Sequence, residues 1–575
     1  MPISKRLPKR ICLPDVEVTD TAPRGYRCYF AVVAVATMLL VLQLCAALAS
    51  AQTYTPLYTY PVGAGSYSGI LPYGQMSQGR DGKFYSTVQN SGVTDRGTAY
   101  SMTTAGQFTG LHDFCLLAGC TDGSYPDGGL ILGADGNLWG TTTSGGTSNE
   151  GTVFKMTPAG NATILWSFNA RNSEQGYPYH PVLLAQDGNY WGTDPGVYSG
   201  TYGVLYKITP AGALTAFPFN YTNGANPNIP TQGTDGNFYG IARGGGAHGF
   251  GTVYKATPSG VITVLHDFAA GVLDGNLPVG TLVQGNDGNF YGMTYAGGAS
   301  NLGTIFKISK TGNFSLLYSF KGWGFGDGAL PYTGLILGTD GNFYGSTANG
   351  GTKNAGALFK FTPSGTITTL YSFCAVTCSD GYYPEVPLVQ HTNGKIYSNS
   401  TGNSLGGAVF FSLDLGIKPF AGLVTWTGKV GKSIGILGQG LTGTTKVTFN
   451  GTTASFTVSS DTFITATVPA GATTGFVNVT TPGGVLKSNR KFLVMPAILN
   501  FDPTSGQVGT SVTITGTSFT GATGVAFGGV AATAFSVNSD TQITATVPTG
   551  AKTGKISVKT PGGTATSSGT FTVLP

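Results

Sequence analysis

The sequence is poor in charged residues. Asp, Glu, Lys and Arg make up 10% of the 575 residues, against about 25% in typical globular proteins. The net formal charge of +5 falls to +2 without residues 1–51, because that segment holds six basic and three acidic residues and leaves 24 minus 22. The remaining chain has no dense block of Lys and Arg, which excludes the usual basis of nucleic-acid binding.

Cysteine and histidine are also scarce. The sequence contains seven Cys and five His, and three of the Cys lie before residue 52. The other four form two close pairs, Cys115 with Cys120 and Cys374 with Cys378. No His or further Cys stands at metal-ligand spacing from either pair, so the spacing predicts two short-range disulfides and neither a metal site nor a cofactor.

Long apolar runs are confined to the N-terminus. Six basic residues precede the apolar run 29–51, which ends in the small residues Ala49-Ser50-Ala51. This arrangement predicts a signal peptide over residues 1–51, cleavage before Gln52, and a secreted or cell-surface protein. The run is also long enough for an uncleaved membrane anchor. A lipoprotein anchored through Cys45 is a weaker alternative, because Leu44 stands where a small residue is expected.

Glycine and aromatic residues are abundant, with 91 Gly, 28 Tyr and 33 Phe. An Asp-Gly motif recurs at a period near 52 residues and marks seven units, at Asp81, Asp135, Asp187, Asp235, Asp287, Asp340 and the degenerate Asn393. Each unit contains four strand-like runs, so the sequence predicts an all-β fold with a seven-bladed β-propeller over residues 52–415, called the repeat region below. Either segment 54–60 or segment 420–424 supplies the strand that closes the last blade.

The motif "DGNFYG" suggests either a calcium loop or a hairpin turn. A calcium loop needs Glu in twelfth place, where the unit of Asp235 has Ala247. We therefore predict a turn in which Asp caps backbone N–H groups and Gly adopts a positive φ. In a four-stranded meander these turns share one face, and the variable and Gly-Gly loops share the opposite one.

That opposite face is the candidate binding face, because binding residues are often carried by variable loops on a rigid scaffold. Aromatic and polar side chains near it suit a carbohydrate or protein ligand, through stacking and hydrogen bonding. The candidate ligand-binding residues are Tyr125, Tyr177, His248, Trp323, Asp327, Tyr382 and Tyr383.

The composition changes after the repeats, to a chain rich in Thr, Val and Gly with few aromatic residues. Residues 459–484 recur as residues 538–563, displaced by 79 positions, which predicts two immunoglobulin-like sandwich domains over 416–496 and 497–575. The segment "FDPTSGQVGTSVTITGTSFTGATGVAFGG" closely resembles the IPT/TIG domain, and the preceding copy resembles it with a less typical start. The array, with its "GLILGTDGNFYG…GGTKNAGALFKFTPSG", resembles the Gloeo/Verruco-type repeat of exported bacterial proteins. The TIG resemblance implies spacer or interaction modules, and neither resemblance implies a defined reaction.

Two functions remain open from the sequence. The leading interpretation is a monomeric, non-catalytic exported or surface protein that binds an extracellular glycan or protein ligand and contacts a membrane only if its leader is uncleaved. The rival is a polysaccharide-active lyase or glycoside hydrolase that uses His248 and loop carboxylates. Those carboxylates recur with the repeat period, which a structural turn explains better than a unique active site does: Asp122, Asp127, Glu174, Asp274, Asp327 and Asp380.

Overall fold

The computed structural model describes residues 52–61, 72–169, 176–196, 202–269, 271, 273–374, 377–402 and 406–575. The predicted signal peptide, residues 1–51, and Glu174 lie outside these ranges. Within them, no helix is long and apolar enough to cross a membrane.

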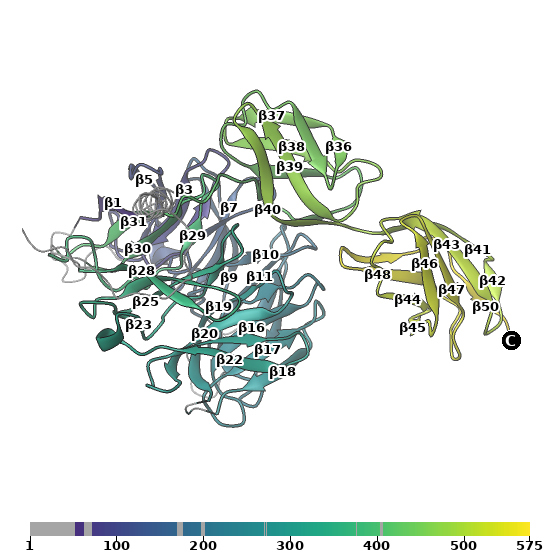
Figure 1. The fold of residues 1–575 in the computed structure, drawn as a ribbon, viewed down its shortest axis with the longest axis horizontal. Coiled ribbons are helices and arrows are strands. Elements are labelled where there is room, and N and C mark those ends of the chain that lie inside the picture. The colour runs from purple at the N-terminus through teal and green to yellow at the C-terminus, as the bar shows by residue number, and fades with distance from the viewer. Residues whose placement is uncertain are drawn as a thin grey trace, which may run out of the picture. The chain divides into compact units, whose positions relative to one another are not determined.

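Each repeat folds into a four-stranded antiparallel sheet whose strands follow one another in sequence order (Figure 1). The first six sheets consist of β2 (Ser77–Gln78), β3 (Phe84–Val88), β4 (Thr98–Met102) and β5 (Phe108–Asp113); β6 (Leu130–Leu132), β7 (Leu138–Thr142), β8 (Thr152–Met156) and β9 (Ala162–Ser167); β10 (Leu183–Leu184), β11 (Tyr190–Asp194), β12 (Val204–Ile208) and β13 (Leu214–Pro218); β15 (Thr231–Gln232), β16 (Phe238–Gly244), β17 (Thr252–Ala256) and β18 (Ile262–Asp267); β19 (Gly275–Gln284), β20 (Phe290–Gly297), β21 (Thr304–Ile308) and β22 (Phe314–Ser319); and β24 (Ile336–Leu337), β25 (Phe343–Thr347), β27 (Ala357–Phe361) and β28 (Ile367–Ser372). Short additions are β14 (Ala225–Pro227) beside β16, the pair β23 (Gly328–Ala329) and β26 (Asn349–Gly350), and the single turns η1 (Ala118–Cys120) and η3 (Trp323–Phe325). The all-β class predicted from the sequence is confirmed.

The next sheet joins the two ends of the repeat region. It contains β29 (Val389–Gln390), β30 (Ile396–Ser400), β31 (Val409–Asp414) and the N-terminal β1 (Thr53–Thr59). β1 pairs antiparallel with β31, so segment 54–60 supplies the outer strand of this sheet. Segment 420–424 instead contributes β32 to the domain that follows.

The Asp-Gly motif forms the turn between the first two strands of a repeat. The Oδ1 of Asp287 accepts the backbone N–H of Asn289 at 3.1 Å, and its Oδ2 accepts the Tyr291 hydroxyl at 2.9 Å. Gly288 has a φ of 81°, which a residue with a Cβ adopts only at a cost. These hydrogen bonds lower the pKa of Asp287 against the effect of its burial. The motif is therefore a self-contained hairpin turn.

Buried aromatic residues join each sheet to its neighbour. Tyr239 on β16 stacks on Phe290 of β20, with ring centroids 4.0 Å apart, and Phe268 meets Phe306 at 5.4 Å. On the third strand of these sheets every residue is buried except a half-exposed Lys, such as Lys307, which lies opposite Tyr291. In two other repeats the ammonium group of the equivalent Lys lies near the ring opposite, with Lys155 6.0 Å from the Trp139 centroid and Lys207 5.9 Å from that of Trp191.

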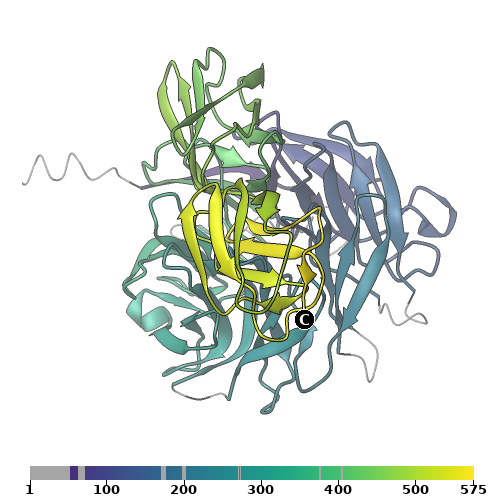
Figure 2. The same ribbon diagram turned by 90° about the vertical axis from the view of Figure 1, so that its right-hand side faces the viewer.

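Two β-sandwiches follow the repeat region, coloured green and yellow in Figures 1 and 2. The first sandwich has one sheet of β32 (Gly422–Leu423), β34 (Ser433–Leu437), β38 (Phe463–Thr467) and β37 (Phe456–Ser460), and another of β33 (Thr427–Gly428), β40 (Gly484–Val494), β39 (Gly475–Thr481), β35 (Lys446–Phe449) and β36 (Thr452–Ala454). The second has β41 (Ala497–Asp502), β43 (Ser511–Thr517), β47 (Gln542–Thr546) and β46 (Phe535–Ser539) facing β45 (Val530–Ala531), β44 (Gly524–Phe527), β48 (Ile556–Thr560) and β49 (Gly563–Thr566), with the pair β42 (Ser505–Gly506) and β50 (Thr572–Val573). Each has its own core of alternating apolar residues, as the sequence predicts for immunoglobulin-like domains.

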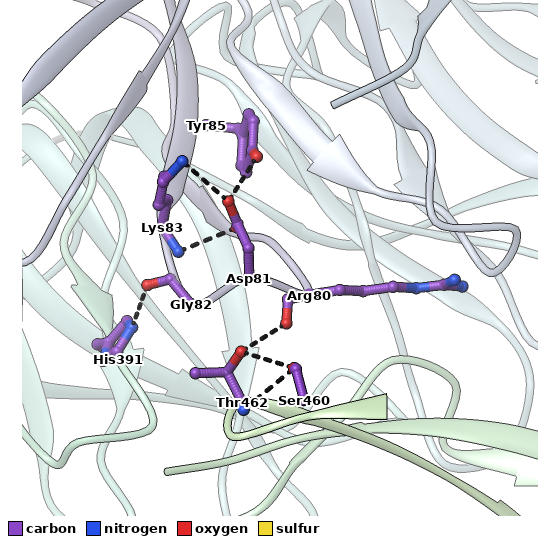
Figure 3. Close-up of polar contacts among 8 residues, drawn as sticks. All are labelled: Arg80, Asp81, Gly82, Lys83, Tyr85, His391, Ser460 and Thr462. Atoms are coloured by element: carbon purple, nitrogen blue, oxygen red, sulfur yellow. Dashed lines mark hydrogen bonds and ion pairs between the residues drawn. The ribbon is translucent and has the colours of Figure 1, made fainter. Parts of the chain in front are cut away.

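The first sandwich packs against Asp-Gly turns of the repeat region (Figure 3). The Thr462 hydroxyl donates to the backbone carbonyl of Arg80 at 2.7 Å, and the Arg80 guanidinium lies 4.6 Å from the centroid of the Phe463 ring. His391 contacts the carbonyl of Gly82 through Nε2 at 2.9 Å. The face that carries the Asp-Gly turns is therefore partly covered by the first sandwich.

Candidate functional site

A repeated proline places one residue from each repeat around a single cavity. The cavity has a volume of about 390 Å³, within the size range of small-ligand sites. In every repeat, the residue directly after this proline lines the cavity. These seven post-proline residues are Tyr73, Asp127, Tyr179, Asn228, Val279, Tyr332 and Glu385. We call this space the post-proline cavity.

The backbone around the proline fixes the position of each post-proline residue. Leu330, which precedes Pro331, has a φ of 52° and donates its N–H to the carbonyl of Leu302 in the preceding repeat at 2.8 Å. The proline ring packs against Gly303, where a Cβ would lie only 2.5 Å from the Pro331 Cδ. The same hydrogen bond and Gly–Pro contact recur between other successive repeats. The cavity is thus lined by residues on a repeated, rigid connection.

Two carboxyl groups lie on one side of the cavity. The Gln89 Nε2 donates to Oδ2 of Asp127 at 3.1 Å, whereas the buried Oδ1 of Asp127 has no partner. Burial raises the pKa of Asp127 to about 7 and also raises that of Glu385. Both carboxyl groups belong to the repeats on either side of that of Tyr73. Burial raises the pKa of the Tyr73 phenol, and the charges of Glu385 and Asp127 raise it further. This side of the cavity attracts protons or other cations.

A cation lies near another part of the cavity wall. Arg243, at the end of β16, lies close enough to Tyr179 for its charge to oppose the burial that raises the pKa of that phenol. The Arg243 guanidinium stands 5.9 Å from the Tyr295 ring centroid and forms no ion pair with any described residue. Burial lowers the pKa of the neighbouring His180 to about 4, so its imidazole is neutral at pH 7.

A second cavity, of about 460 Å³, lies between the repeat region and the first sandwich. Trp426 and Arg490 of the sandwich line it, and the Arg490 guanidinium lies 5.3 Å from the Trp426 ring centroid. The residues that line both cavities are Gln75, Pro181, Ile229 and Thr281. The two cavities therefore adjoin, and the first sandwich borders the approach from this side.

None of the ligand-binding residues predicted from the sequence lines the post-proline cavity, although three of them lie in the segments that do. Tyr125, Tyr177 and Tyr383 each precede the proline, and each donates its backbone N–H to the preceding repeat. They stand two positions before Asp127, Tyr179 and Glu385. The predicted tyrosines thus belong to the segments that line the cavity, and the recurring proline marks the position of the lining residue in each segment.

The other predicted residues have separate surroundings. Trp323 is 64% exposed and donates its indole N–H to the carbonyl of Thr352 at 3.0 Å. His248 is exposed in a loop, and Tyr382 packs edge-on against Tyr383. Asp327 is buried and accepts the Tyr318 hydroxyl at 2.7 Å. These residues form no single cluster.

The recurrent loop carboxylates cap the loops of their own repeats. Asp122 accepts the Leu116 N–H at 2.8 Å, and Asp274 accepts the Ala269 N–H at 3.0 Å. Asp127 is the exception among them, because it lines the post-proline cavity.

Disulfides close the two predicted loops, Cys115 with Cys120 and Cys374 with Cys378. Among the described residues, no group of three or more His, Cys, Asp and Glu side chains is placed to hold a metal ion.

Comparison with known proteins identifies both parts of the chain. Residues 47–217 and 178–411 match the Gloeobacter/Verrucomicrobia repeat, and residues 419–491 and 496–573 match the IPT/TIG domain. Both family resemblances seen in the sequence are thereby confirmed. A search of curated proteins finds no match.

Similar solved structures are remote. A fungal alcohol oxidase of the AA5 family, in complex with copper, is 14% identical over 78% of this chain and 100% of its own, with a TM-score of 0.40. A putative gluconolactonase is 11% identical over 64% of this chain and 94% of its own, with a TM-score of 0.33. SGBP-B, from a xyloglucan utilization locus of Bacteroides uniformis, is 21% identical over 26% of this chain and 48% of its own, with a TM-score of 0.14. At such low TM-scores these likenesses carry no functional argument.

Proposed function

The chain belongs to the Gloeobacter/Verrucomicrobia repeat family, and we propose from this that its repeat region is a seven-bladed β-propeller that binds an extracellular ligand without catalysing a reaction. Contacts between the first and last repeats support a closed ring. The Gln78 Nε2 donates to the Thr392 hydroxyl at 2.8 Å in a buried position, and the rings of Phe84 and Tyr397 lie 4.8 Å apart. β1 completes the last sheet, which leaves it with the same strand number as the others.

The observation that carries the binding proposal is the composition of the post-proline cavity. Three of its seven post-proline residues are tyrosines, and Asn228, Asp127 and Glu385 add hydrogen-bonding groups. Tyrosine rings stack on the apolar faces of sugar rings, while amide and carboxyl groups bind hydroxyls. A carbohydrate residue is therefore the proposed ligand, and the TIG domains act as interaction and spacer modules.

A glycan array followed by calorimetric titration of the mature chain tests this proposal. We expect Tyr332→Ala to weaken binding at least tenfold, because it removes an aromatic wall of the cavity, at about 1.4 kcal/mol per tenfold change. Trp323→Ala and His248→Ala are matched controls, since both lie outside the cavity. Loss of binding in these controls, with normal binding by Tyr332→Ala, would move the site to the variable loops.

A second candidate function rests on Asp127 and Glu385. Two carboxyl groups with raised pKa values in one cavity are suited to general acid catalysis by a polysaccharide hydrolase or lyase. The test is incubation with every glycan that binds, followed by detection of new reducing ends or unsaturated products. Under the binding proposal we expect none. Product that forms with the wild type and disappears with Glu385→Gln would establish the enzyme instead.

We also propose export through cleavage of residues 1–51, a monomeric mature chain, and domain limits at residues 415 and 496. The apolar run with its Ala49-Ser50-Ala51 end supports cleavage. Mass spectrometry of the exported protein should give a chain that begins at Gln52, and light scattering should give the mass of one copy. A chain retaining the leader in the membrane fraction would show an anchor.

A further inference from the structure

The charges of the post-proline cavity are separated. In repeat order Asp127 and Glu385 lie on either side of Tyr73, whereas Arg243 is carried by β16, two repeats beyond that of Asp127, and all three residues line the cavity. From this geometry we infer that the ligand is zwitterionic, with an ammonium group near Asp127 and Glu385 and an anionic group near Arg243. This inference rests on the proposed function, because it concerns the ligand of the same cavity.

The acidic side of the cavity has unused capacity for a cation. Gln89 donates a hydrogen bond to Oδ2 of Asp127 and Thr143 lies close enough to help lower its pKa, but neither is charged, and the buried Oδ1 receives no hydrogen bond from a described residue. No ion pair involves Asp127 or Glu385 in the part of the chain that the structure describes. A buried carboxyl group without a partner is costly, and an ammonium group with three N–H donors satisfies it. Tyr73 and Tyr332 add electron-rich ring faces that favour cations.

The basic side is similarly uncompensated. Arg243 is half-buried, and its guanidinium, which lies over the Tyr295 ring, forms no hydrogen bond or ion pair with a residue in the described ranges. Asp194 is the acid whose charge acts on Tyr179, and burial raises the pKa of Asp194 to about 8. Asp194 is therefore mostly protonated at pH 7 and does not neutralise Arg243. A planar guanidinium with free donors suits a carboxylate or phosphate.

The remaining titratable groups facing the cavity leave this charge separation unchanged. His180 is neutral at pH 7, since burial lowers its pKa to about 4. Burial raises the pKa values of Tyr73 and Tyr179, so both phenols stay protonated. A ligand with a single charge leaves one side of the cavity unpaired, whereas a zwitterion matches both sides.

Four sugars on one scaffold separate the two charges: glucose, glucosamine, glucose 6-phosphate and glucosamine 6-phosphate. Titration calorimetry of the mature chain at pH 7 should rank glucosamine 6-phosphate tightest, with each charge worth at least about tenfold in Kd, the size expected of hydrogen bonds to charged groups. Binding of glucosamine should also release protons as Asp127 ionises, seen as a heat that varies with the buffer.

Single variants assign each charge to its side. Arg243→Gln should remove the advantage of the phosphate and keep that of the amine, and Glu385→Gln should reduce the advantage of the amine and keep that of the phosphate. Lys353→Gln removes an exposed charge outside the cavity and should change neither. If glucose binds as tightly as glucosamine 6-phosphate, the inference of a zwitterionic ligand is wrong, while the sugar-binding proposal stands. Failure of all four sugars to bind would overturn both.

Discussion

Replacement of Asp127 by Asn should stabilise the protein at neutral and alkaline pH. Burial raises the pKa of Asp127 from its ordinary value of 3.8 to about 7. At a pH between these two pKa values, Asp127 holds a proton in the folded chain that it has lost in the unfolded chain. The free energy of unfolding therefore falls as the pH rises. An Asn side chain does not titrate, and its amide oxygen can still accept the hydrogen bond from Gln89.

The size of the effect follows from the difference in pKa. A difference of about three, at about 1.4 kcal/mol per pKa unit, amounts to about 4 kcal/mol. The advantage of Asp127→Asn over the wild type should therefore be small near pH 4, grow between pH 4 and 7, and remain constant above about pH 7. This pH dependence is the reverse of that of an acid in a salt bridge, whose contribution to the free energy of unfolding is lost as the pH falls.

Urea unfolding followed by tryptophan fluorescence measures this difference, because Trp139 and Trp191 are fully buried within the repeat region. Midpoints at pH 4.5, 6, 7 and 8.5 give the pH profile for each variant. Asp95→Asn is the control, since Asp95 is exposed and lies outside the post-proline cavity. A difference between Asp127→Asn and wild type that changes by less than about 1 kcal/mol from pH 4.5 to 8.5 refutes the reasoning.

Three further predictions concern the scaffold. Gly303→Ala should destabilise the protein by roughly 2–4 kcal/mol in the same urea assay, because its Cβ would lie 2.5 Å from Pro331 Cδ at a φ of 97°; an unchanged midpoint would show that the connection yields. Asp287→Ala should cost about 2 kcal/mol by removing the turn hydrogen bonds, including that of Tyr291, and a loss below about 0.5 kcal/mol would contradict this role. Phe463→Ala should cost about 3–5 kcal/mol and speed proteolysis between the repeat region and the first sandwich; equal cleavage rates would mean that the docking does not depend on this ring.

Much of the fold follows from local chemistry that a sequence displays. The hairpin turn is fixed by contacts within five residues, such as those of Asp287 with Asn289 and Tyr291, so its motif repeats visibly. The pairing of β1 with β31 was one of two alternatives, because strand alternation alone does not choose between two segments of similar composition. The structure decides in favour of the N-terminal strand.

The sequence indicated the segments that carry the candidate site but not the residues that line its cavity. Tyr125 and Tyr383 are aromatic and repeat in place, which drew attention to them, yet their backbone holds the repeats together and the cavity is lined by Asp127 and Glu385. The cavity residues differ in chemical type, so the proline before each of them is the one shared mark of their position. Their convergence depends on contacts between repeats more than 300 residues apart, such as Gln78 with Thr392.

Docking of the first sandwich was likewise beyond the sequence. Thr462 and Phe463 lie in a segment that has a close copy in the second sandwich, where Thr541 and Gln542 take their places, and the difference between Phe and Gln does not by itself reveal a contact with Arg80. The face with the Asp-Gly turns is consequently more than the back of the scaffold, because part of it is an interface.

The repeated proline connection assigns two roles to different atoms. Backbone and proline-ring atoms hold successive repeats together, and the side chain of the next residue lines the cavity. The hydrogen bond to the preceding repeat and the Gly–Pro contact involve backbone and ring atoms, so the residue after each proline can change without disturbing them. In chain order, the seven post-proline residues are Tyr, Asp, Tyr, Asn, Val, Tyr and Glu. If the proposed function holds, single substitutions at these seven positions should change the ligand specificity of the cavity and leave the contacts between repeats intact.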